Sequence, residues 1–451
     1  MLVISLKKLD KKTPGILKKI KGSFAIELRL DLIKIQDIKK FKKEIDCEII
    51  FTLKKKFLEN KRLDKRLDEL FLLKPDYIDL EHDAPLHFFE KIKKETSIKI
   101  ISSFHDYKKT PSLEKIFLKM QNPFADIYKI ASFANSSLDS LTMLQFVQKK
   151  VKEGFKICGV CMGEKGDITR ILAPLVGSFT YASINGPTAP GQLSYEILEN
   201  RYRYSSLNID SSIYALIGGD VSKSVSDIIH NKVLALSQKN GVYVKISLLK
   251  KELPLFFEKI KTLSFKGISV TMPFKEKVGR VLKEKKKPFP INTLVKKNKK
   301  WTGYNTDGIG ALAALEKRIL LKDKTIIILG AGGAAKAIAL AVLKRKANVI
   351  ILNRTRKRAL FLARELNCRG GGLDDMEFYK KYDVLINATA SEDPLEKKCF
   401  LPGSIAFDIH SRPQMTGFLK KALSKNCSLI YGFEMFIYQA KEQYRLWEKN
   451  N

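Results

Sequence analysis

The feature that most constrains the fold is an even alternation of strand-like and helix-like segments along about the first 185 residues. Eight short runs of β-branched and apolar residues recur about every 20 to 30 residues. They begin at Leu2, Phe24, Glu48, Tyr77, Ile98, Ile127, Phe155 and Ser178. Segments with helical periodicity, such as SLEKIFLKMQ and LDSLTMLQFVQKKVKE, lie between them. This count and spacing predict a closed (β/α)8 TIM barrel, with an open doubly wound sheet as the alternative.

Unusual polar residues fall at the C-terminal ends of these predicted strands, where a barrel builds its active face. They are Glu27, Arg29 and Asp31 in ELRLD, Asp79 and Glu81 in YIDLE, His105 in SSFHD and Lys129 in IYKIA. Burying an ammonium group without a role is costly, so a lysine inside an apolar strand indicates function. A single histidine at a strand end is also compatible with a structural hydrogen bond, and that alternative stays open for His105.

These residue types suit imine formation followed by proton removal. We expect apolar, cation-rich surroundings to lower the pKa of Lys129, which would make its amine nucleophilic toward a ketone. A histidine within hydrogen-bonding range would then remove the proton next to the iminium and later protonate a leaving hydroxyl. Arg29, Arg170 and Lys54 offer cations for a substrate carboxylate.

The motifs ELRLD, SSFHDYKKTP, DIYKIA and the run from MGEKGDITR to PTAPGQ resemble type I 3-dehydroquinate dehydratases over about the first 205 residues. The resemblance implies that Lys129 forms the Schiff base with 3-dehydroquinate, that His105 is the general base and acid, and that Glu81 orients it. It further implies substrate contacts at Glu27, Arg29, Arg170, Thr188 and Gln192. Lys54 stands where the family usually has an arginine, which keeps the charge but loses the bidentate fork.

The second half contains TIIILGAGGAAKAIALAVL, a predicted strand followed by Gly330-x-Gly332-x-x-Ala335 at the start of a predicted helix. A second predicted strand, NVIILNRT, follows. This strand–glycine turn–helix–strand context predicts a Rossmann lobe that binds a dinucleotide at the helix N-terminus. An acidic residue at the end of the second strand would select NAD, whereas this chain has Arg354 there. A guanidinium suits a 2′-phosphate, so NADP(H) is the predicted cofactor.

The motifs GGDVSKSVSDIIHN, SVTMPFK, PINTL, GYNTDGIG, GAGGAA, NRT, INATA and GFEMFIYQA resemble shikimate dehydrogenases from residue 212 onward. The resemblance implies that Lys275 and Asp307 are the catalytic pair, although their spacing alone also fits a solvated helix start and an N-cap. The implied substrate contacts are Ser224, Ser226, Thr271, Asn292 and Gln439. The predicted cofactor contacts are Gly330, Ala331, Gly332, Gly333, Ala334, Asn353, Arg354, Thr355, Arg358, Thr389, Ile409 and Gly432.

Four departures from this second family pattern concern the substrate side. Asp220 and Asp227 replace prolines of the serine motif, Lys223 replaces a histidine, and Ser411 stands where a substrate-contacting tyrosine is usual. They leave open a preference for quinate over shikimate. Lys54, Asp220 and Ser411 also leave open a regulatory homologue with impaired catalysis. The two halves together predict a bifunctional enzyme that dehydrates 3-dehydroquinate and reduces the resulting 3-dehydroshikimate.

The predicted α/β organisation has three parts. Residues 1–209 form the dehydratase barrel, and residues 210–313 form a substrate-binding lobe to which a C-terminal helix at 432–451 returns. Residues 314–431 form the Rossmann NADP lobe. We expect small-molecule substrates as partners, while the oligomeric state is not readable.

The composition adds several expectations. The formal net charge is +35, from 83 Lys and Arg against 48 Asp and Glu. Because the lysines are spread along the whole chain, they indicate solvated faces and no specific nucleic-acid site. Six cysteines without a paired motif beyond Cys158 and Cys161 indicate neither a disulfide scaffold nor a metal site. With no readable signal peptide or membrane-length apolar run, we expect a cytoplasmic protein.

Overall fold

The computed structural model describes residues 1–20, 22–54, 63–282 and 290–449. The chain forms two compact units, the first made of residues 1–216 and 220–265 and the second of residues 217–219 and 266–451. Within the described residues, no helix combines the length and the apolar character that crossing a bilayer would need.

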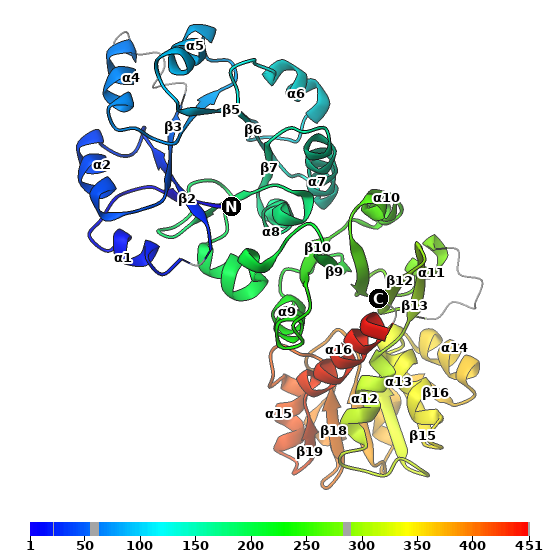
Figure 1. Cartoon of the computed structure of the whole chain (residues 1–451). Helices are drawn as coiled ribbons and strands as arrows, with labels where there is room; N and C mark the ends of the chain where they lie inside the picture. The colour runs from blue at the N-terminus through cyan, green and yellow to red at the C-terminus, as the bar shows by residue number, and fades with distance from the viewer. Residues whose placement is uncertain (21, 55–62, 283–289, 450–451) are drawn as a thin grey trace. The chain divides into compact units, whose positions relative to one another are not determined.

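The first unit is dominated by a parallel eight-stranded barrel (Figure 1). Its strands are β1 (Leu2–Leu6), β2 (Phe24–Arg29), β3 (Glu48–Leu53), β4 (Tyr77–Glu81), β5 (Lys99–His105), β6 (Ile127–Phe133), β7 (Ile157–Met162) and β8 (Thr180–Ser183). They pair in the order β7-β6-β5-β4-β3-β2-β1-β8, so β8 returns to β1 and the barrel is nearly closed, with β7 and β8 at the two ends of this order. The predicted barrel is confirmed, and the open-sheet alternative is wrong.

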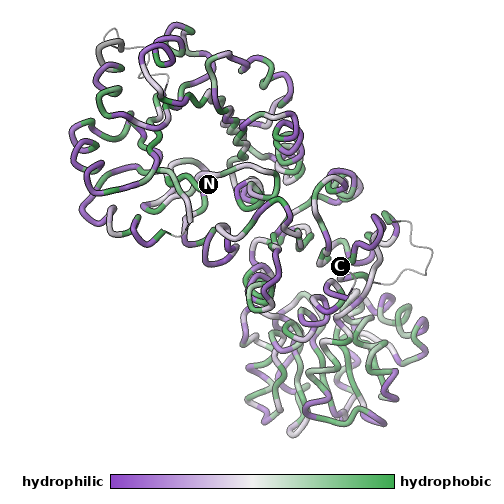
Figure 2. Tube along the Cα trace, in the orientation of Figure 1, coloured by the Kyte–Doolittle hydropathy of each residue, from purple (hydrophilic) through white to green (hydrophobic). Residues whose placement is uncertain are grey.

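Helices surround the ring of strands, as Figure 1 shows. They are α1 (Thr13–Leu17), α2 (Ile35–Phe41), α4 (Leu63–Phe71), α5 (Leu86–Glu95), α6 (Leu113–Met120), α7 (Ser137–Lys152) and α8 (Asp167–Ile171). The strands are mostly green in Figure 2, whereas the helices carry purple outer faces. A parallel sheet covered on its outer face needs apolar side chains toward both the helices and the interior, which explains the continuous apolar runs.

The interior of the barrel is closed by an apolar layer to which every strand contributes. It includes Val3, Ala25, Ile50, Tyr77, Ile101, Ile127, Val160 and Tyr181. Cys158 also belongs to this layer, and burial raises the pKa of its thiol to about 12. This thiol therefore contributes packing and has no reactive thiolate at neutral pH.

The remainder of the first unit follows the barrel. After a π-helical turn (η4, Ile197–Arg201) come β9 (Ser212–Gly218), α9 (Ser226–Leu236), β10 (Gly241–Ser247) and α10 (Leu253–Lys259). Lys259 donates to Thr142 Oγ1 of α7 at 2.6 Å, and Ser136, the N-cap of α7, donates to Glu252 at 2.6 Å. The segment 220–265 is thus bonded directly to the barrel.

The second unit combines an antiparallel set of strands with a parallel sheet. The antiparallel strands are β11 (Phe265–Val270), β12 (Thr293–Lys297) and β13 (Lys300–Tyr304), with α11 (Val278–Val281) between the first two. The predicted C-terminal helix is observed as α16 (Gly432–Lys449), and its last two predicted positions lie outside the described residues. Trp447 of α16 donates to the carbonyl of Leu294 at 3.1 Å, so the end of the helix lies against β12.

The parallel sheet has the strand order β16-β15-β14-β17-β18-β19, which is the order of a doubly wound dinucleotide-binding fold. Its strands are β14 (Thr325–Leu329), β15 (Asn348–Asn353), β16 (Arg369–Gly372), β17 (Val384–Asn387), β18 (Ile405–Asp408) and β19 (Ser428–Ile430). Its helices are α12 (Asp307–Leu315), α13 (Gly333–Leu343), α14 (Arg356–Leu366) and α15 (Gly417–Leu423). The predicted Rossmann lobe is confirmed.

Candidate active sites

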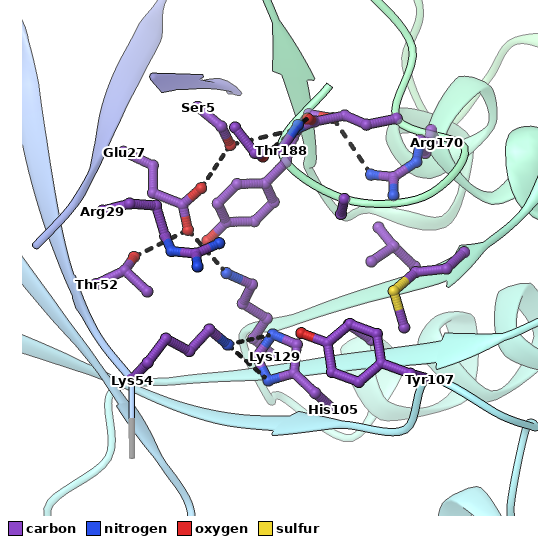
Figure 3. A pocket seen from close by; sticks show the side chains of 16 residues that line it. Ser5, Glu27, Arg29, Thr52, Lys54, His105, Tyr107, Lys129, Arg170 and Thr188 are labelled. Atoms are coloured by element: carbon purple, nitrogen blue, oxygen red, sulfur yellow. Dashed lines mark hydrogen bonds and ion pairs between the residues drawn. The ribbon is translucent and has the colours of Figure 1, made fainter. Parts of the chain in front are cut away.

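A pocket opens above the apolar layer of the barrel, toward the C-terminal ends of the strands (Figure 3). Side chains on one face of a strand recur every second residue, so the next layer upward follows from the sequence. Two residues beyond Val3, Ala25, Ile50, Tyr77 and Ile127 stand Ser5, Glu27, Thr52, Asp79 and Lys129. All five of these polar side chains are buried. The strand periodicity therefore places a charged layer directly on an apolar floor.

Lys129 is held by two carboxylates. Its Nζ lies 2.8 Å from Asp79 Oδ2 and 3.2 Å from Glu27 Oε1, and 3.9 Å from the centre of the Tyr181 ring. Burial alone would lower the pKa of this ammonium, but Asp79 and Glu27 outweigh it and raise the pKa well above its ordinary value. The expectation of a lowered pKa is therefore wrong, because the sequence pattern did not reveal that both carboxylates point at the amine.

His105 faces a carboxylate and a cation at the same time. Its Nδ1 lies 3.2 Å from Glu81 Oε2, while Lys54 Nζ lies 3.2 Å from its Nε2 and 2.9 Å from Glu81 Oε1. Burial, followed by the charge of Lys54, lowers the pKa of His105 despite Glu81. The pKa of Glu81 falls to about 2, since His105 and Lys54 outweigh its burial. His105 is thus a neutral base at neutral pH.

The predicted cations and polar contacts of the barrel also reach this pocket. Arg170 is 2% exposed, donates to the carbonyl of Tyr181 at 3.3 Å, and has a buried Nε without a hydrogen-bond partner. A buried guanidinium with unused donors suits an anion. Arg29 is instead bidentate to Asp31, at 2.8 and 2.7 Å.

A chain of hydrogen bonds continues the polar layer across the pocket. Thr188 donates to Gln192 Oε1 at 2.8 Å, Gln192 donates to Ser5 Oγ at 3.3 Å, and Ser5 donates to Glu27. The predicted Thr188, Gln192 and Glu27 are therefore brought together with Lys129. Ser5 joins them although no motif pointed to it.

The sequence reasoning missed several residues of this layer. The sequence pattern predicts no role for Asp79, yet Asp79 makes the shortest contact to Lys129. The sequence did carry a signal for Asp79, because Asp79 and Glu81 are two positions apart and therefore lie on the same face of β4. Tyr181, Ser5 and Thr52 carried no signal that separated them from ordinary strand residues.

In the second unit, Lys275 and Asp307 form a close ion pair. Lys275 Nζ lies 2.6 Å from Asp307 Oδ2, and Asn292 Nδ2 donates to the other carboxylate oxygen at 2.7 Å. Asp307 is 2% exposed at the first position of α12, where its charge is favoured by the helix dipole. Asn292 in turn accepts from the backbone N–H of Thr306 at 2.8 Å, which fixes its amide. The three predicted residues therefore form one hydrogen-bonded cluster.

In the part of the chain that the structure describes, the other predicted substrate-binding residues are not hydrogen-bonded to Lys275 or Asp307. Thr271 is half-buried at the end of β11, and Gln439 is half-buried on α16 beside Gly310. In the first unit, Ser224 and Ser226 are 2.9 Å apart, measured between their Oγ atoms. Of the departures, Asp220 is exposed, Ser411 is half-buried and Asp227 is fully buried.

The glycine turn after β14 fits a dinucleotide. Gly330 has φ +113°, and a Cβ there would come within 2.6 Å of the carbonyl of Ala388. A Cβ at Gly332 would meet nothing within 4 Å, so open space lies before the N-terminus of α13, where a pyrophosphate is expected. A Cβ at Gly333 would lie 3.8 Å from Lys275 Cβ, so this turn and the ion pair are neighbours.

The remaining predicted cofactor residues line the ends of neighbouring strands. Ala331 belongs to the turn and Ala334 to the first turn of α13. Asn353 ends β15, Arg354 and Thr355 follow it, and Arg358 lies in the first turn of α14; Arg354 is exposed. Thr389 donates to Asn387 Oδ1 at 2.8 Å, and the N–H of Ile409 donates to the carbonyl of Asn387 at 3.1 Å. A Cβ at Gly432 would overlap the carbonyl of His410, so close packing requires glycine there.

Comparison with known proteins matches three separate segments of the chain. Residues 3–209 match the family model of type I 3-dehydroquinase. Residues 216–288 match the shikimate dehydrogenase substrate binding domain, and residues 313–401 match shikimate/quinate 5-dehydrogenase.

Relatives that span both halves are found among curated proteins. The shikimate biosynthesis protein AroDE of Chlamydia pneumoniae is 35% identical over 453 residues, covering 96% of this chain and 91% of its own length. The chloroplastic bifunctional 3-dehydroquinate dehydratase/shikimate dehydrogenase of Arabidopsis thaliana is 32% identical, covering 94% and 78%. A crystal structure of a shikimate dehydrogenase in complex with NADP+ is 34% identical and covers 54% of this chain and 92% of its own, with a TM-score of 0.50. The chain belongs to the family of bifunctional type I 3-dehydroquinate dehydratase/shikimate dehydrogenases.

Proposed function

We propose that this chain catalyses two consecutive steps of the shikimate pathway, the dehydration of 3-dehydroquinate and the NADPH-dependent reduction of 3-dehydroshikimate to shikimate. Residues 1–209 would carry the first reaction, residues 210–313 with 432–451 would bind the substrate of the second, and residues 314–431 would bind NADP. The observation that carries the proposal is the buried Lys129 amine, which shares one pocket with the neutral base His105.

In the first reaction, Lys129 is proposed to add to the ketone of 3-dehydroquinate. Its ammonium must first lose a proton, and Asp79, Glu27 and His105 are the acceptors in the pocket. Attack on the carbonyl carbon and loss of water then give an iminium, which draws electrons from the adjacent C–H bond. His105 takes that proton and returns one to the departing hydroxyl as the double bond forms. Water finally releases 3-dehydroshikimate and regenerates the amine.

Four further residues are proposed to hold the substrate in this pocket. Arg170 would bind the substrate carboxylate, because its buried guanidinium has unused donors. Thr188 and Gln192 would contact the substrate from the loop after β8, and Arg29 from the end of β2. Glu81 would keep His105 oriented, and Glu27 would hold the amine before attack.

In the second reaction, Lys275 and Asp307 are proposed to move the proton on the oxygen that changes oxidation state. When bound, NADPH supplies the hydride. Lys275 would donate to the carbonyl oxygen, and Asp307 would keep the ammonium aimed while Asn292 holds Asp307. Ser224 and Ser226 would bind the substrate carboxylate, and Thr271 and Gln439 its ring hydroxyls. Arg354 would bind the 2′-phosphate of the cofactor.

Borohydride trapping tests the first half of this proposal. Reduction in the presence of 3-dehydroquinate is expected to leave a stable adduct on Lys129, detectable by mass spectrometry of the digested protein. Lys129→Met should abolish both the adduct and dehydration. Lys150→Met is the matched control, since Lys150 is also a buried barrel lysine but pairs with Glu114 and Glu153 away from the pocket. An adduct on another lysine would refute the assignment.

The preference between shikimate and quinate is tested by steady-state rates with both substrates and both cofactors. The departures at Asp220, Lys223, Asp227 and Ser411 motivate quinate as the alternative. We further propose that the partners are small molecules, with no specific nucleic acid or membrane, and that the protein works in the cytoplasm. The free thiols of all six cysteines agree with a reducing compartment.

A further inference from the structure

Asp227 is a buried carboxylate in the first turn of α9, directly after Ser226, and its side chain is fully shielded from solvent. Its Oδ2 accepts hydrogen bonds from Tyr202 Oη at 3.0 Å and from Arg201 Nη1 at 3.4 Å. Both donors belong to the segment that ends the barrel. Proline, the residue of the shikimate dehydrogenase pattern, has no side-chain acceptor, so this contact depends on the aspartate of this chain.

The other oxygen of Asp227 faces Lys245 of β10, whose Nζ lies 3.8 Å from Oδ1. The same Nζ donates to the carbonyls of Ser222 at 2.8 Å and Ser224 at 3.1 Å. Lys245 therefore holds the loop that carries the serine pair through two hydrogen bonds and places its charge near Asp227 Oδ1, which is buried without a hydrogen-bond partner of its own among the described residues. The backbone N–H of Ser226 donates to Ser224 Oγ at 3.2 Å, so the two serines are fixed relative to each other.

The middle of the same helix is held independently. The ring of His230 stacks on Tyr243 at 4.3 Å, and Asn231 exchanges two hydrogen bonds of 2.8 Å with the backbone of Tyr243. These contacts lock the middle of α9 to β10. The serine end of the helix depends instead on Asp227, because a buried carboxylate is tolerated only when it is paired and hydrogen-bonded.

We propose that Arg201 and Tyr202, at the end of the dehydratase barrel, are positioning residues for the second reaction. Through Asp227 and Lys245 they set the serine pair in the geometry that receives the carboxylate of the shikimate-class substrate. The inference rests on the proposed role of Ser224 and Ser226. It makes the first catalytic module a structural part of the carboxylate site of the second.

Kinetics of conservative variants test this coupling. In Tyr202→Phe and Asp227→Asn, we expect KM for shikimate to rise about three- to tenfold, because a charge-assisted hydrogen bond is lost and the serine loop loosens. The value of kcat at saturation and KM for NADP+ should stay within about twofold, since the reacting groups are untouched. The double variant should raise KM no more than the stronger single variant, as expected for partners in one contact.

Tyr204→Phe is the matched control, because Tyr204 is a buried tyrosine of the same segment whose hydroxyl donates to the carbonyl of Met1 instead. Dehydratase activity of each variant, measured on the same preparation, reports whether the barrel is intact. A loss of both activities together with a lower melting temperature would indicate a general folding defect and would overturn the inference.

A variant of the serine pair distinguishes a failure of this inference from a failure of the proposed function on which it rests. Ser224→Ala should raise KM for shikimate more than Tyr202→Phe does. If Ser224→Ala leaves KM unchanged, the proposed carboxylate site is wrong. If Ser224→Ala raises KM while Tyr202→Phe and Asp227→Asn behave like Tyr204→Phe, the site stands and the positioning role of the barrel is refuted.

Discussion

Replacing Lys54 by methionine is expected to shift the pH dependence of the dehydratase reaction. Lys54 Nζ lies 3.2 Å from a ring nitrogen of His105, and its charge lowers the pKa of that imidazole. With the side chains of Lys54 and His105 18% and 12% exposed, the effective dielectric constant of about 20 for pairs near a protein surface applies. At 3.2 Å the repulsion is then about 5 kcal/mol, which is an upper figure because the Glu81 carboxylate contacts both groups and offsets part of it.

The sign follows from the role of His105 as a base. Removing the cation favours the imidazolium, so the pKa of His105 rises and the neutral form is lost at higher pH. The acid limb of log kcat/KM for 3-dehydroquinate should move upward by about 1 to 2 units, since that parameter reports the free enzyme. Glu81 starts from a pKa of about 2 and stays ionised throughout.

The assay follows the absorbance of the enone product from pH 5 to 9 for the wild type, Lys54→Met and Lys54→Arg. Lys54→Arg is the matched control, because it keeps the charge and should leave the acid limb in place. A rise in KM alone, with the limb unmoved in Lys54→Met, would show that Lys54 only binds substrate. That result would refute the reasoning.

Three further outcomes are expected. Arg354→Asp should lower kcat/KM for NADPH by about 100-fold while NADH changes little, because a carboxylate repels the 2′-phosphate; steady-state rates with both cofactors check this, and unchanged selectivity would place the phosphate elsewhere. Asp307→Asn should lower kcat for shikimate oxidation by about two to four orders of magnitude with dehydration intact; a normal kcat would remove Asp307 from the proton relay. Lys129→Met should destabilise the barrel at pH 7, because Asp79 and Glu27 stay buried without their cation. The raised pKa of Lys129 in the folded state means that its stabilisation is complete below about pH 10.5 and fades above it, so urea unfolding should show the gap to wild type narrowing there; a constant gap would contradict the ion pairs.

Much of this architecture could be predicted because it depends on local pattern. Strand and helix periods revealed the barrel, and a glycine turn between strand and helix revealed the Rossmann lobe. Strand-end position was enough to bring Lys129 and His105 into one pocket. Each of these inferences uses only neighbours along the chain and the alternation of side chains on a strand.

The parts that could not be predicted depend on contacts between distant segments. The raised pKa of Lys129 comes from Asp79, 50 positions away, and Glu27, 102 positions away. From the sequence, Asp227 is only a departure from a motif, and the fold is needed to show that the Tyr202 hydroxyl donates a hydrogen bond to it. A carboxylate's partner is set by tertiary packing, which periodicity does not encode.

The return of α16 to the sheet orders events during synthesis of the chain. All eight barrel strands are complete by Ser183, so the ribosome releases a foldable domain early. Helix α16, which covers β11 and β12, is synthesised after every strand of the second unit. Until Trp447 emerges, the space kept free by Gly267 for its indole stays uncovered. We therefore expect a stage of synthesis in which the barrel can already fold while β11 and β12 still lack the cover that α16 provides.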